Sequence, residues 1–165
     1  MDAKKYLLVL MVLIAMSGVG KAQNSLTVTN RSTTTFEMTN IIISGNHTET
    51  VVDNNQWMNY SFNWNWSDPL ATISVAIASG TIPPGMEIYI QAGNYNGSGR
   101  GHAGKPTGKI KLGYIPTVLI NGIGDVNTGH GKHQGHQITL SILIVDYALV
   151  QPGNYTLNLQ YTLNQ

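Results

Sequence analysis

The sequence predicts an all-β protein, an immunoglobulin-like antiparallel β-sandwich of about 7–9 strands. The first reason is that apolar residues recur at every second position in several segments, which is the period of a strand with one buried face. The second reason is that no window after Gln23 keeps an apolar repeat at helical spacing. Turn-forming sequences such as 83–85 and 152–154, both rich in Pro and Gly, separate the alternating segments.

Residues 1–22 are predicted to be a secretory signal peptide. Lys4 and Lys5 precede an apolar run of eleven residues, 6–16, which is too short to cross a hydrocarbon layer of ~30 Å as a helix. Gly20 and Ala22 supply the small residues expected before a cut at Gln23, whereas the alternative, a permanent anchor, needs a longer apolar run. We therefore expect a single sandwich domain, residues 23–165, that is secreted to the periplasm or the cell surface and has no membrane span after cleavage.

The candidate strands follow one another along the whole mature chain. They are residues 26–29, 36–44, 48–52, 58–66, 71–77, 87–91, 117–121, 138–145 and 155–163. In 58–66, Met58 and four aromatic residues share one face. The polar residues that alternate with them, Asn59 first, are therefore predicted to point to solvent. Segment 155–163 keeps a period of two throughout, so Leu157 and Leu159 are predicted to be buried.

The segment 138–145 differs from the others because its alternation gives way to four consecutive apolar residues, 142–145. That pattern is typical of a strand in the middle of a sandwich, and we expect it to be central. Two stretches, 94–108 and 122–135, consist mostly of Gly, Asn, Ser and Thr with few apolar residues, and they are predicted to be loops.

Charge and cysteine content exclude several classes of function. Removal of the signal peptide leaves six basic residues against seven acidic ones, without a basic cluster, which argues against nucleic acid as a partner. The chain has no cysteine, which excludes disulfides and thiolate zinc sites.

Three histidines, His130, His133 and His136, recur every third residue in the second Gly-rich stretch. Three imidazoles at this spacing, with Asp125 as a possible oxygen ligand, could bind Zn, Cu or Ni. A Gly-rich loop loses much conformational entropy when it is ordered, so we favour the alternative of a solvated polar loop with incidental histidines.

The aromatic residues of segment 57–66 suggest a second candidate site. Trp57, Trp64 and Trp66 could form a platform on which sugar rings stack. Because Tyr60 to Trp66 alternate with polar residues, the inner face of the sandwich is the simpler interpretation of the stripe. Trp66, which precedes an Asp-Pro turn, is predicted to be the most exposed of the three.

No segment carries the local pattern of an active site. Residues 99–106 resemble a phosphate-binding loop, but Pro106 stands where a hydroxyl residue is needed and no helix follows. Neither a nucleophile elbow nor a His-Glu helix motif is present. We therefore predict a protein that is not an enzyme and has no cofactor.

The C-terminal segment 151–163, which begins with a Pro-Gly-Asn-Tyr turn and continues as an alternating strand, resembles the closing strand of secreted pilin-like proteins of Gram-negative bacteria. These are immunoglobulin-type sandwiches related in pattern to the spore-coat-U and chaperone-usher pilins. Two features depart from that pattern: Tyr161 is the fifth residue from the end rather than the last but one, and the pilin disulfide is absent. The resemblance implies a secreted structural subunit more firmly than it implies assembly by a dedicated chaperone and usher.

The expected function is therefore that of a non-enzymatic structural or adhesive subunit, whose partners are other copies of itself or related surface subunits. Such subunits assemble when a sheet edge accepts an extended segment from a neighbour. The candidate donor is 23–29, where Leu26 and Val28 alternate with Thr, although this segment could equally be the first strand of its own domain. The alternatives are a carbohydrate-binding module that uses the exposed Trp residues and a periplasmic metal-binding protein that uses the histidine loop.

Overall fold

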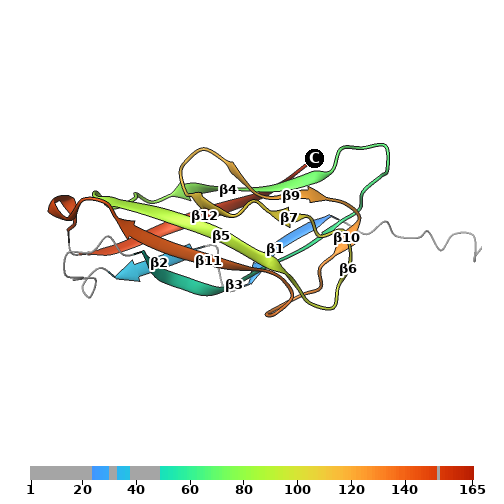
Figure 1. Ribbon diagram of the computed structural model, residues 1–165, viewed down its shortest axis with the longest axis horizontal. Coiled ribbons are helices and arrows are strands. Elements are labelled where there is room, and N and C mark those ends of the chain that lie inside the picture. Colours follow the sequence, from blue (N-terminus) through green and yellow to red (C-terminus); the bar gives the residue numbers. More distant parts are fainter. Residues whose placement is uncertain (1–23, 30–32, 38–48, 152) are drawn as a thin grey trace, which may run out of the picture.

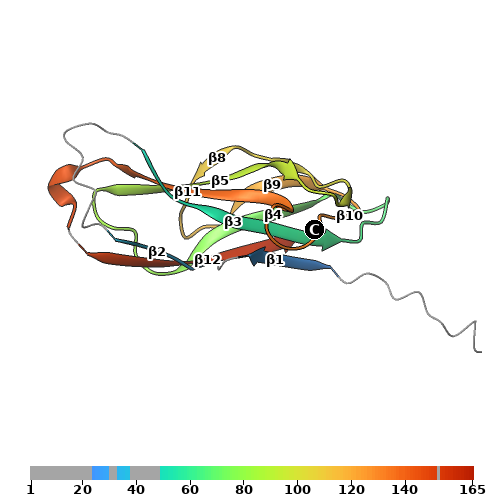
Figure 2. The ribbon, with the colours of Figure 1, turned by 90° about the horizontal axis from the view of Figure 1, so that it is seen from below.

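The computed structural model describes residues 24–29, 33–37, 49–151 and 153–165. Two antiparallel β-sheets pack against each other, which confirms the predicted all-β sandwich, and the long strands run along the long axis of the molecule (Figures 1 and 2). The strands are β1 (Ser25–Thr29), β2 (Thr33–Glu37), β3 (Thr50–Phe62), β4 (Ala71–Ser79), β5 (Met86–Asn96), β6 (Arg100–Gly101), β7 (Lys105–Pro106), β8 (Lys109–Lys111), β9 (Thr117–Ile123), β10 (Val126–Asn127), β11 (Gly135–Ile144) and β12 (Asn154–Asn164).

The larger sheet has the strand order β6-β10-β3-β11-β5-β8, with β1 also paired to β3. The smaller sheet has the order β2-β12-β4-β9-β7. Strand β11 pairs with β3 on one side and β5 on the other, so its predicted central position is correct. A short 3-10 helix, Tyr147–Leu149, connects β11 to β12, and its start is capped by Asp146, whose carboxylate accepts a hydrogen bond from the Ala148 N–H.

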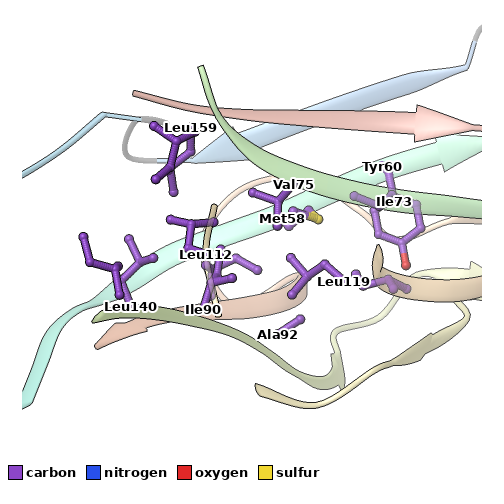
Figure 3. Close-up of a cluster of buried hydrophobic side chains, with 14 of the residues drawn as sticks. Met58, Tyr60, Ile73, Val75, Ile90, Ala92, Leu112, Leu119, Leu140 and Leu159 are labelled. Carbon is purple, nitrogen blue, oxygen red and sulfur yellow. The ribbon is translucent and has the colours of Figure 1, made fainter. Parts of the chain in front are cut away.

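The core lies between the two sheets and is built from alternate residues of the long strands (Figure 3). The fully buried residues include Met58 and Tyr60 of β3, Ile73 of β4 and Ile90 of β5. On β12, Leu157 and Leu159 are buried, whereas Thr156 and Gln160 are exposed, as the period of two in that segment predicts.

Several predicted boundaries differ from the structure. The strands expected over 48–52 and 58–66 are parts of one strand, β3, which begins at Thr50 and ends at Phe62. The predicted loops contain the short strands β6, β7 and β10, and β8 was not predicted at all. The candidate strand 36–44 lies largely outside the described residues, as does the predicted signal peptide.

Candidate functional site

Strand β1 lies on the larger sheet of its own chain. It pairs antiparallel with β3, with Leu26 opposite Tyr60 and Val28 opposite Met58. Both apolar side chains are half-buried and pack against the core. In this structure the candidate donor segment therefore occupies the position of a first strand of its own domain.

Among the described residues, strand pairing covers only half of the edge that β12 forms in the smaller sheet. Strand β2 pairs with residues 154–158 of β12, while β4 pairs with residues 158–164 on the opposite side. Beyond Asn158, no described strand pairs with the side of β12 that β2 covers. Because backbone groups of alternate residues point to opposite sides of a strand, part of the N–H and C=O groups of 159–164 face away from β4 at this open edge.

A groove of about 590 Å³ runs beside this open edge, between β12 and β1. It is lined by Leu26 and Val28 of β1, by Ala78 of β4 and by residues 159–163 of β12. The groove therefore combines an unpaired strand edge with apolar side chains from both sheets.

Tyr161, one of the residues that line the groove, has a hydroxyl that is buried and makes no hydrogen bond with any described residue. Burial raises the pKa of this hydroxyl, and the nearby Asp53 carboxylate raises it further, so the group stays neutral. A buried neutral hydroxyl without a partner can still donate a hydrogen bond, and its burial without one is energetically unfavourable.

The histidine loop does not bring its three imidazoles together. His136 lies on β11 and is buried, whereas His130 and His133 are exposed in the loop that precedes β11. The described residues contain no group of three or more His, Cys, Asp or Glu side chains that could hold a metal ion. The candidate three-histidine site is therefore not assembled in the structure, because β11 turns His136 into the interior.

Both ring nitrogens of His136 already have partners. Its Nδ1 lies 2.8 Å from the Gly93 carbonyl oxygen, and its Nε2 lies 2.9 Å from the Tyr60 hydroxyl. Since a carbonyl only accepts, Nδ1 carries the proton and Nε2 of the neutral ring accepts from Tyr60. The Ala103 carbonyl also lies within hydrogen-bond distance of the Tyr60 hydroxyl, so this carbonyl and Nε2 of His136 compete for its one proton. Burial lowers the pKa of His136, which favours this neutral form.

The rest of the loop folds back over the outer face of β3. The ring of His133 packs edge-on against Trp57 with 5.1 Å between centroids, which buries Trp57. Asn59 donates to the Gln134 carbonyl at 2.6 Å and accepts from the Gly131 N–H at 3.0 Å. Asn59 is therefore buried, contrary to the prediction that it faces solvent, because the loop supplies both of its partners.

The three candidate tryptophans do not share one exposed surface. Trp57 is 4% exposed and Trp66 is 84% exposed. Trp64 is half-buried, and its indole N–H donates to the Asp68 carbonyl at 2.9 Å. A platform that uses all three rings is therefore wrong, and Trp66 is the exposed ring, as predicted.

We expect weak zinc binding or none when the purified protein is titrated by calorimetry. With His136 engaged by Tyr60 and Gly93, only His130 and His133 remain, and two loop ligands close no tetrahedral site. A submicromolar affinity that disappears in the double variant His130→Ala, His133→Ala would contradict this, with His102→Ala as the matched control.

No family model, curated protein or solved structure matches the chain. Among the described residues, no helix has the length and apolar character needed to cross a membrane.

Proposed function

We propose that this protein is a non-enzymatic, exported structural subunit that joins a surface fibre or adhesive layer by strand addition. The observation that carries the proposal is the half-covered edge of β12 beside an apolar groove. An unpaired strand edge is a template for another chain, and natural proteins usually block it with charged residues, Pro or a covering segment. The open stretch 159–164 contains neither charged residues nor Pro.

The incoming segment would be extended and would alternate apolar with polar residues. Its backbone would pair with β12 and continue the line of β2, while its apolar side chains would enter the groove between Leu26, Val28 and Leu159. In this mode of recognition, main-chain hydrogen bonds supply affinity and the pockets for alternate side chains supply specificity.

The donor would come from another copy or from a related surface subunit. Within this chain residues 23–29, whose Leu26 and Val28 have the required spacing of two, already form β1 and line the groove, so they could act as a donor only if β1 left its own β3. Exchange of β1 between copies would also be possible, since each β3 would then pair with a neighbour's β1 through the same contacts.

A charge on the open edge should prevent assembly. We expect Thr162→Lys to shift the sedimentation of the purified protein from oligomer to monomer while its melting temperature stays close to that of the wild type, because Thr162 is exposed and a lysine there opposes pairing with another strand. Thr156→Lys is the matched control, since Thr156 is exposed on the same face of β12 but lies where β2 already covers the edge.

The two modes of assembly give different results. If Thr162→Lys still assembles but deletion of residues 23–30 yields a folded monomer, then β1 exchange is the mechanism and the β12 edge is not the acceptor. If both variants assemble like the wild type, or if the wild type remains monomeric at all concentrations, strand addition is the wrong function.

A further inference from the structure

A second cavity lies at the end of the larger sheet where β6 and β10 run beside the end of β3 (Figure 1). Its volume is about 390 Å³, and none of its lining residues belongs to the groove between β1 and β12. None of the loop histidines and none of the candidate tryptophans lines it, although Asp125, the possible oxygen ligand of the histidine site, does.

The backbone around this cavity fixes the position of Arg100. Arg100 lies directly opposite Asn127 in the pairing of β6 with β10, and glycines flank it on both sides. A Cβ at Gly99 would lie 2.2 Å from the Asn127 carbonyl oxygen, and one at Gly101, where φ is +101°, would lie 2.1 Å from that of Asp125. Only glycine permits so close an approach of the two strands, so the position of Arg100 beside β10 depends on both glycines.

Hydrogen bonds beyond the short strands stabilise the same arrangement. The His102 N–H donates to the Asp125 carbonyl at 2.9 Å, and the Gly124 N–H donates to the His102 carbonyl at 3.0 Å. The segment that carries Arg100 is therefore also fixed beyond β6 against the segment that carries Asp125.

The polar side chains around the cavity have unused hydrogen-bonding capacity. The side chains of Arg100, Asp125 and Asn63 make no hydrogen bond or ion pair with any described residue, and all three are exposed. Asn127 accepts from the Gly129 N–H at 3.0 Å through its Oδ1, which leaves its amide N–H groups available. Phe62 and Val126 also border the cavity, but their pairing with each other and with Gly101 places their buried side chains on the core face of the sheet, opposite the face that carries Arg100 and Asn127.

This combination fits a sugar ring better than other ligands. Each sugar hydroxyl both donates and accepts, and the cavity offers donors from Arg100 and Asn127 and acceptors from Asp125 and Asn63. A phosphate would meet the Asp125 carboxylate, and a divalent cation would find a single carboxylate in a lining that also includes the Arg100 guanidinium. We propose that this cavity binds a neutral pyranose residue of a glycan, independently of any strand addition.

The test is saturation-transfer NMR of the full mature chain with methyl glycosides of glucose, galactose and mannose, followed by titration of the one that binds. We expect at least one to bind in the millimolar range and Arg100→Ala and Asp125→Asn each to weaken it by about tenfold or more, because each removes a charged hydrogen-bonding partner. Thermal melts should be nearly unchanged in both variants, since both side chains are exposed and neither makes a hydrogen bond or ion pair with a described residue.

Lys132→Ala serves as the matched control, because Lys132 is an exposed cation that does not line the cavity, and it should leave binding unchanged. Trp66→Ala separates the cavity from a stacking site on the exposed ring. The proposal is overturned if none of the three glycosides binds, if Trp66→Ala abolishes binding while Arg100→Ala does not, or if inorganic phosphate competes with the sugar at Arg100.

Discussion

Replacement of Leu159 by Ala should lower the free energy of unfolding by about 2–5 kcal/mol, as large-to-small core substitutions do. Leu159 is 5% exposed and belongs to the cluster between the sheets (Figure 3), so truncation leaves a cavity in addition to the lost burial. Denaturation by urea, followed by circular dichroism, measures the change.

The matched control is Gln160→Ala on the opposite face of β12, which should change stability by no more than about 0.5 kcal/mol. Asn158 is a poorer control, although it also alternates with Leu159, because its amide donates to the Ser79 hydroxyl at 2.6 Å. Equal losses at Leu159 and Gln160 would mean that β12 does not bury the predicted face.

Replacement of Gly135 by Ala should destabilise the fold by about 3 kcal/mol or more. Gly135 begins β11 with a φ of +81°, and an added Cβ would lie 2.0 Å from the Met58 carbonyl oxygen. The substitution therefore adds a clash with the backbone of the central strand β3 to the strain of a left-handed conformation.

Gly131→Ala separates these two effects, because Gly131 has a similar φ of +87° and no atom within 4 Å of the added Cβ. We expect Gly131→Ala to cost only the conformational strain, about 1–2 kcal/mol. Denaturant titrations of the two variants in parallel give the difference between their free energies of unfolding. Equal losses of stability would show that the clash between the added Cβ and the backbone of β3 is relieved at no energetic cost.

The short strands show why the loops were poorly predicted. Segment 100–106 has little apolar character, so no periodicity marks β6 or β7. Their pairing with β10 and β9 depends on glycines at close approaches, such as Gly101 against Asp125. A glycine in a sequence indicates a turn or a close approach equally well, and only the neighbouring strand distinguishes them.

The sequence by itself determined the fold class and the inward faces of the long strands. Successive side chains of a strand point to opposite sides, and the apolar side must be buried away from water. Leu157 and Leu159 are buried for that reason. Only the tertiary structure decided that Asn59 and His136 are buried, because a polar side chain is buried where partners satisfy it. Those partners are remote: Asn59 and Gln134 are 75 residues apart in the chain, and His136 and Tyr60 are 76 apart. The open edge of β12 is likewise a tertiary property, since it depends on where β2 stops rather than on any residue of β12.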